Sequence, residues 1–91
     1  MSGVSIDDVW SRLKDFEGHD FTTKKGLPFT FTLRGDIFRP SRTKYNVAKS
    51  DFCKALKYVP YTGPGKINHI VRGPSYVWAV LHDKRIRQYD W

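Results

Sequence analysis

The spacing of apolar residues changes abruptly at Gly18, and this change limits the folds open to the chain. Before Gly18 the apolar residues recur every three or four positions, as they do along one face of an amphipathic helix. They are Ile6, Val9, Trp10, Leu13 and Phe16. After it, every second residue from Leu27 to Leu33 is apolar, which is the period of a strand with one buried face. The sequence therefore predicts an α+β fold, with an N-terminal helix packed on a small antiparallel sheet.

The ends of the first helix also have sequence signatures. Ser5 and Asp8 have the spacing of a capping box, with Asp in place of the usual Glu. Gly18 is a suitable residue for a left-handed helix terminator. We therefore expect a helix over residues 6–17.

Three antiparallel strands are expected next, at 21–23, 27–34 and 37–39, with Pro40 ending the third. The following residues, 40–49, lack a helical stripe and predict an extended basic loop, with a short strand at 45–47.

The second half of the chain predicts two more helices. Ser50 has the character of an N-cap for a helix over 51–59. A short strand is expected at 67–71. The apolar run after Ser75 favours a buried helix over 76–83, with a central strand at 76–81 as the alternative, because a short apolar run has no diagnostic period.

The length of 91 residues is enough for one compact domain spanning 1–91. The only cysteine, Cys53, can form neither an internal disulfide nor a zinc site by itself, so a reducing compartment is expected. The sequence contains neither an apolar run of about 20 residues nor a signal peptide, which predicts a cytoplasmic protein with no membrane partner.

Positive charge is concentrated in the later part of the chain. Residues 1–20 carry a net charge of −3, whereas residues 21–91 carry +10. Bases are densest between Arg34 and Lys57. Such clustering is typical of proteins that bind nucleic acid or another polyphosphate.

The first candidate site combines the basic loop with the outer face of the helix at 51–59. Guanidinium, ammonium and aromatic groups are the ones that contact phosphates, sugars and bases. An ordinary solvated surface is the alternative interpretation. The predicted contact residues are Arg39, Arg42, Lys44, Tyr45, Lys49, Lys54, Lys57 and Tyr58.

A second candidate site lies at Arg72 and Ser75, where a glycine-bearing turn would open onto a helix N-terminus. Ser75 would cap the helix, and Arg72 would add a positive charge for an anion. A structural turn with a capping serine is the competing interpretation.

No catalytic constellation is visible in the sequence. The GPGK run at 63–66 is not a P-loop, because Pro60 stands where the motif needs glycine and Ile67 where it needs Ser or Thr. The histidines are widely separated, the carboxylates lie at turns and caps, and Cys53 is expected to be half-buried packing. We therefore predict a protein that is not an enzyme and uses no metal or cofactor.

The favoured function is a small nucleic-acid-binding module, with duplex DNA preferred over RNA because no strand presents an exposed aromatic pair. A protein-interaction subunit is the second hypothesis, in which the acidic first helix and the basic remainder support homo-oligomer or hetero-oligomer formation. A small nuclease or phosphodiesterase is the third.

Overall fold

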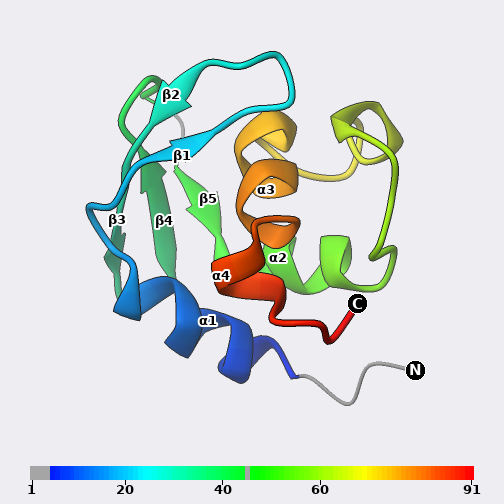
Figure 1. Ribbon diagram of the computed structural model, residues 1–91, viewed down its shortest axis with the longest axis horizontal. Coiled ribbons are helices and arrows are strands. Elements are labelled where there is room, and N and C mark those ends of the chain that lie inside the picture. Colours follow the sequence, from blue (N-terminus) through cyan, green and yellow to red (C-terminus); the bar gives the residue numbers. More distant parts are fainter. Residues whose placement is uncertain (1–4, 45) are drawn as a thin grey trace.

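The computed structural model describes residues 5–44 and 46–91. Helices and small antiparallel sheets alternate with turns, so the predicted α+β fold, with the N-terminal helix ahead of the strands, is confirmed (Figure 1). The elements are α1 (Ile6–Asp15), β1 (Phe21–Thr22), β2 (Pro28–Phe29), β3 (Phe31–Arg34), β4 (Ile37–Pro40), β5 (Val47–Ala48), α2 (Lys49–Leu56), the 3₁₀ turn η1 (Pro64–Lys66), α3 (Pro74–Leu81) and α4 (Lys84–Arg87).

Helix α1 begins with the predicted capping box. The Asp8 amide donates to the Ser5 hydroxyl, and the Ser5 amide donates to the Asp8 carboxylate, each at 3.2 Å. Val9 and Leu13 are fully buried on the inner face. The helix ends at Asp15, two residues earlier than predicted, and Gly18 adopts the expected left-handed conformation with φ +83°.

The strands form two sheets. β1 pairs with β2 as the predicted hairpin, and β3, β4 and β5 form a three-stranded antiparallel sheet. The strand predicted over 27–34 is interrupted at Thr30, whose amide donates to the Ser41 hydroxyl while its carbonyl accepts from the Ser41 amide. The strand predicted at 45–47 is β5, shifted to Val47–Ala48, and Tyr45 lies outside the described residues.

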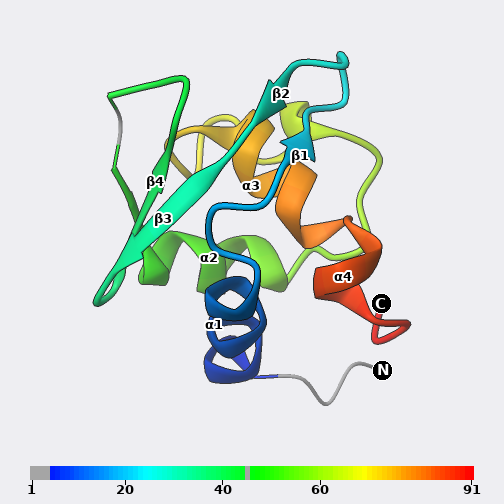
Figure 2. The ribbon, with the colours of Figure 1, turned by 60° about the vertical axis from the view of Figure 1, so that its left-hand side comes forward.

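Aromatic rings from the sheet and from α2 form the centre of the core. Phe31 stacks on Phe38 with ring centroids 4.8 Å apart, and Phe38 contacts Phe52 of α2 at 5.0 Å. Trp10 of α1 meets Phe52 edge-on at 5.3 Å. Because α1 packs against β3, α2 and α4, it closes one end of the core (Figure 2).

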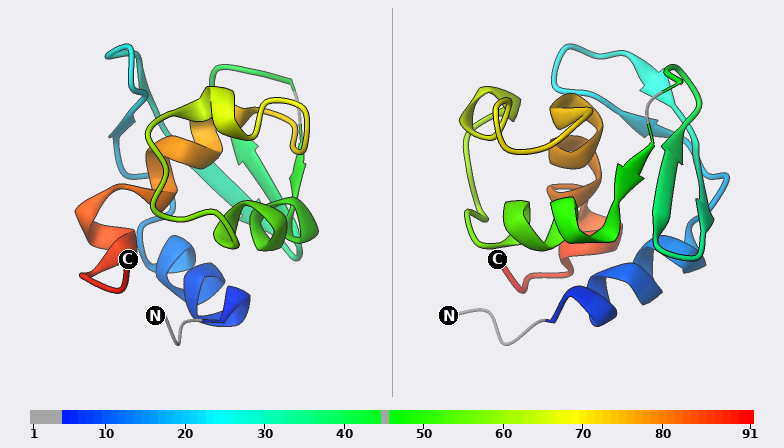
Figure 3. Two further views of the ribbon diagram at one scale, coloured as in Figure 1. Left: turned by 90° about the vertical axis from the view of Figure 1, so that its right-hand side faces the viewer. Right: turned by 180° about the vertical axis from the view of Figure 1, so that it is seen from behind.

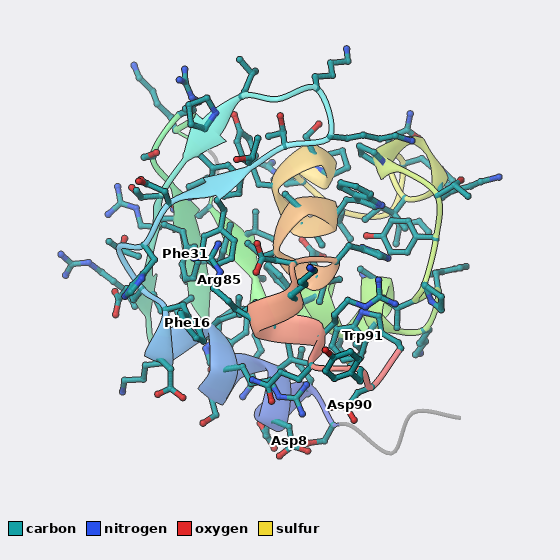
Figure 4. All side chains as sticks on the ribbon, in the orientation of Figure 1. Asp8, Phe16, Phe31, Arg85, Asp90 and Trp91 are labelled. Atoms are coloured by element: carbon teal, nitrogen blue, oxygen red, sulfur yellow. The ribbon has the colours of Figure 1, made fainter. Side chains whose placement is uncertain are left out.

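Helix α4 is tied to the first half of the chain by Arg85. Its guanidinium carbon lies 3.9 Å from the ring centroid of Phe21, and its nitrogens donate to both carboxylate oxygens of Asp83. Nη2, one of these two nitrogens, also donates to the Asp20 carbonyl at 2.7 Å. Figure 4 shows Arg85 between α4 and the sheet, near Phe16 and Phe31.

Helix α2 begins earlier than predicted. Ala48 occupies the N-cap position without a side-chain cap bond, so the prediction of Ser50 as N-cap is wrong, and the helix ends at Leu56 instead of residue 59. The shift arises because β5 pairs with β4 up to Ala48 and the chain enters the helix directly afterwards.

No strand forms at 67–71. Ile67 follows η1, and the amides of Ile70 and Val71 both donate to the Ile67 carbonyl, which makes consecutive turns. The predicted strand at 67–71 is therefore wrong, and Ile67 and Val71 are buried from a turn.

The helix predicted over 76–83 is confirmed as α3, and the alternative strand at 76–81 is wrong. Its N-cap is Gly73, in the left-handed conformation with φ +58°, and Pro74 occupies the first turn. Ser75 therefore lies inside the helix, and the prediction that it caps the helix is wrong.

Candidate functional site

Charge is segregated between the two ends of the molecule. One end, which we call the basic end, consists of residues 23–28, 39–44 and 63–75, at the top of Figure 1. It contains no Asp or Glu. Its seven bases are Lys24, Lys25, Arg39, Arg42, Lys44, Lys66 and Arg72.

The rest of the chain is electrically balanced. It holds nine acids and nine bases, so the basic end carries the whole net charge of +7. Helices α1 and α4, which bear or adjoin most of the acids, lie at the opposite end (Figure 1). The nine acids are Asp7, Asp8, Asp15, Glu17, Asp20, Asp36, Asp51, Asp83 and Asp90.

Hydrogen bonds and a shared cavity join the three segments of the basic end. The Arg42 guanidinium donates to the Pro28 carbonyl, and the Lys24 ammonium donates to the Thr62 carbonyl at 2.6 Å. The loop after β4 is thus held against the β1–β2 hairpin, and the hairpin is held against the segment before η1.

Strand β4 and the loop after it carry three of the predicted contact residues. Arg39 lies opposite Thr32 in the sheet and is exposed on its outer face, and Arg42 and Lys44 are exposed in the loop. A shallow cavity of about 600 Å³ is lined by 41–44, where two hydroxyls stand beside the two cations. These are suitable groups for phosphate oxygens.

The second candidate pair also belongs to the basic end. Arg72 is exposed just before α3, and Ser75 lines a cavity of about 180 Å³ together with Lys24 and Lys25 from the β1–β2 turn. The structure therefore brings the hairpin lysines to the α3 site, although the sequence places them 50 residues apart.

The lysines near α2 have a different environment. The Lys49 ammonium lies 2.6 Å from Asp7 and 4.0 Å from Asp36, and the hydrogen bond to Asp7 raises the pKa of Lys49. Lys54 lies 3.9 Å from Asp51. Both cations face carboxylates, so the structure does not unite the loop and the helix into one positively charged surface.

The remaining predicted residues of α2 stay on its outer side. Lys57 and Tyr58 are exposed at the end of the helix. Lys57 lines a groove of about 490 Å³ with Lys49 and Lys54, and Asp7 and Asp36 lie on the same rim. Figure 3, seen from behind, shows α2 crossing this face with β5 leading into it.

The histidine nearest to the core, His82, has a structural environment. Its Nε2 accepts from the Tyr61 amide at 3.1 Å, and its Nδ1 lies 3.0 Å from the Trp78 carbonyl. Nδ1 must carry the proton, because a carbonyl only accepts. Burial lowers the pKa of His82, and the neutral ring is the one that satisfies both partners.

Two further predictions concern reactive or metal-binding groups. Cys53 is exposed beside the α2 groove, so the prediction that it is half-buried packing is wrong. Within residues 5–44 and 46–91, no group of three or more His, Cys, Asp or Glu side chains is placed to hold a metal ion.

Sequence reasoning missed three bases of the basic end: Lys24, Lys25 and Lys66. The sequence does contain a signal for these bases, namely the absence of acids from 21–35, from 37–50 and from 52–82. The density of bases along the chain indicated Arg34–Lys57 instead, and the helical part of that segment folds next to acids.

Comparison of the chain with protein-family models, with curated proteins and with solved structures gives no match. Across the two described ranges, no helix combines the length and apolar character that crossing a membrane requires. The function must therefore be argued from the charge distribution and the surface geometry.

Proposed function

We propose that this protein binds nucleic acid through its basic end, without catalysing a reaction. The observation that carries the proposal is the concentration of the whole net charge of +7 on segments that contain no acid. Like charges gathered in this way repel one another unless an anionic partner neutralises them. A polyanion with regularly spaced phosphates is the partner best suited to several such cations at once.

The side chains of the basic end are suited to contacts with phosphate groups. Arg39, Arg42 and Arg72 offer planar donors for paired hydrogen bonds to phosphate oxygens, and Lys25 and Lys44 offer exposed ammonium groups. Ser41 and Thr43 add hydroxyls in the loop. Such contacts hold a nucleic acid in place without reading its sequence.

Duplex DNA is the preferred partner in this proposal. Single-strand binding needs exposed aromatic rings in series on which bases can stack. The three segments of the basic end contain no Phe, Tyr or Trp, and Tyr76, which follows the third segment, is half-buried and packs edge-on against Phe29 at 5.0 Å. Its lysines and arginines are therefore better suited to a phosphate backbone than to stacked bases.

We also place the protein in a reducing compartment, the cytoplasm. An exposed free thiol at Cys53 is more stable there than in an oxidising compartment.

The test is fluorescence anisotropy of a labelled 20-base-pair duplex titrated with protein over a salt series. If four to six cations contact phosphates, log K should fall with log salt with a slope of about −4 to −5. Single-stranded DNA and duplex RNA, titrated identically, should bind more weakly. Affinity equal to that of an unrelated protein of the same pI would refute the proposal.

Two double variants that each remove two positive charges test which surface binds the duplex. Lys25→Ala with Lys44→Ala removes two exposed cations of the basic end, whereas Lys54→Ala with Lys57→Ala removes two from α2. We expect the first pair to flatten the slope by about 1.8, and the second to change it by less than about 1. Equal changes would indicate diffuse attraction to the whole molecule, and a larger change from the α2 pair would place the site on the helix.

A second candidate function is self-association, favoured by the opposite chemistry of the two ends. The acid-bearing surface of α1 in one copy complements the basic end of another, a head-to-tail arrangement that propagates unless it closes into a ring. Light scattering at low and high salt separates the two functions. A mass above 10.6 kDa that falls to the monomer value at high salt, in the absence of nucleic acid, would support self-association.

A further inference from the structure

A cavity lined by aromatic and basic side chains lies away from the basic end, beside α4. Its volume is about 420 Å³, which is within the range of small-molecule sites. Two cations and two aromatic rings line it: Lys84, Arg87, Tyr89 and Trp91. Figure 4 shows Trp91 and Asp90 at this corner of the molecule.

The walls of the cavity are fixed by hydrogen bonds. The Trp91 indole donates to the Leu81 carbonyl at 2.7 Å, and the Arg87 guanidinium donates to the Trp91 carbonyl. Arg12 of α1 donates to the Ile86 carbonyl at 2.9 Å, which ties α1 to the end of α4. The indole ring and the arginine are thereby held before any ligand arrives, which reduces the entropy lost on binding.

Asp90, the acid between Tyr89 and Trp91, is paired on the α1 side. The Asp90 carboxylate lies 2.5 Å from the Arg12 guanidinium, on the α1 side. The lining side chains carry two positive charges and no acid, and the Arg87 guanidinium also donates to the main-chain oxygen of Trp91. An anionic group in the cavity would therefore meet two cationic side chains, Lys84 and Arg87.

The backbone conformation that exposes Tyr89 to solvent is energetically unfavourable. Gln88 and Tyr89 both adopt the left-handed conformation, with φ +47° and +68°, which is unfavourable for residues with a β-carbon. The ring of Tyr89 is fully exposed at the edge of the cavity. A large aromatic side chain that is held open in this way can stack on a planar ligand.

We propose that this cavity binds a nucleotide, whose base stacks on Tyr89 and Trp91 and whose phosphate meets Lys84 and Arg87. The site is separate from the basic end and does not depend on the proposed function. Two sources share this chemistry: a free mononucleotide, and an unpaired nucleotide at the end of a nucleic acid.

The test measures AMP binding by the shift of the Trp91 indole resonance in ¹H–¹⁵N spectra. Adenosine and inorganic phosphate each lack one half of the recognised group, so each should bind at least tenfold more weakly than AMP. Tyr89→Ala should weaken AMP binding by about fivefold or more, because stacking is lost. Tyr58→Ala, the matched control at an exposed tyrosine near α2, should leave AMP affinity unchanged.

A second variant separates the phosphate contact from stacking. Lys84→Ala should weaken AMP binding and leave adenosine binding unchanged, since adenosine has no phosphate. To distinguish the two sources, a duplex with a one-nucleotide overhang is compared with a blunt duplex. If the protein prefers the overhang duplex and Tyr89→Ala removes this preference, the ligand of the cavity is an unpaired nucleotide at the end of a nucleic acid. If AMP binds but the two duplexes bind equally, the ligand is a free nucleotide.

Failure of this proposal differs from failure of the proposed function. AMP affinity should survive Lys25→Ala with Lys44→Ala, and Tyr89→Ala should leave the salt slope for blunt duplex unchanged. AMP that shifts no Trp91 signal, or that binds Tyr89→Ala as tightly as the parent, would overturn the nucleotide site.

Discussion

The half-buried position of His82 makes the stability of the protein dependent on pH near neutrality. In the folded chain its neutral ring accepts from the Tyr61 amide and donates to the Trp78 carbonyl. The neutral ring carries its hydrogen on Nδ1. Protonation would add a hydrogen on Nε2, where it would face the amide hydrogen of Tyr61. Burial, aided by the positive charge of Arg87, lowers the pKa of His82.

The direction in which stability changes with pH follows from the difference in proton uptake by His82 between the folded and unfolded states. Above the unfolded-state pKa of about 6.5 the ring is neutral in both states, and the full stability is present. As the pH falls below this value, the unfolded chain takes up a proton that the folded chain does not, so stability is lost. The loss continues until the pH passes the lowered folded-state pKa, with a slope of at most about 1.4 kcal/mol per pH unit for one proton.

The substitution His82→Phe isolates this proton. Phe preserves a ring against Trp78, which stacks on His82 at 5.1 Å, and against Tyr61, which meets it edge-on at 4.7 Å. It removes two hydrogen bonds, so we expect a loss of about 2 kcal/mol at pH 7.5. The variant should also lose the His82 contribution to the slope between pH 7 and 5.

Urea unfolding followed by circular dichroism at several pH values measures both effects. His69→Gln is the matched control, because it removes an exposed histidine in place of His82. An unaltered slope in His82→Phe, or a parent protein whose stability increases as the pH falls from 7 to 5, would refute the assignment of a half-buried neutral imidazole.

Two other perturbations test the caps and the charge balance. Ser5→Ala should cost about 1 kcal/mol in thermal unfolding because it removes a working cap, whereas Ser75→Ala should cost less than about 0.5 kcal/mol because its side chain caps nothing. Asp7→Asn with Asp36→Asn releases Lys49 from both carboxylates and should strengthen duplex binding severalfold. In anisotropy titrations the salt slope should steepen by about 0.9 if Lys49 gains a phosphate contact; an unchanged slope would show that only the net charge mattered.

Local sequence rules predicted the elements whose ends depend on adjacent residues. The capping box at Ser5 and Asp8 needs only neighbours in the chain. The alternation from Leu27 to Leu33 predicted one strand, but the hydrogen bonds between Thr30 and Ser41 divide it into β2 and β3. The start of α2 depends instead on a partner strand, since β5 stays extended only while β4 pairs with it. The start of α3 depends on the left-handed Gly73, which a rule that looks for capping serines does not detect.

The candidate site was harder to predict than the fold because its charges are brought together, or neutralised, by distant residues. Lys49 lies within the densest basic segment, yet Asp7 comes 42 residues earlier and lies 2.6 Å from it. Lys25 lies outside that segment, yet it shares a cavity with Ser75. A run of bases predicts a positively charged surface only when the sequence also shows which acids fold beside it.

The absence of acids is therefore a more informative sequence signal here than the presence of bases. Bases occur at both ends of the molecule, since Lys84, Arg85 and Arg87 lie on α4, at the end opposite the basic end. There Asp83 engages Arg85, and the other two cations line the aromatic cavity. The segments of the basic end contain no Asp or Glu. In our two proposals the surfaces therefore recognise different groups: a charged backbone at the basic end, and a planar ring with one anionic group beside α4.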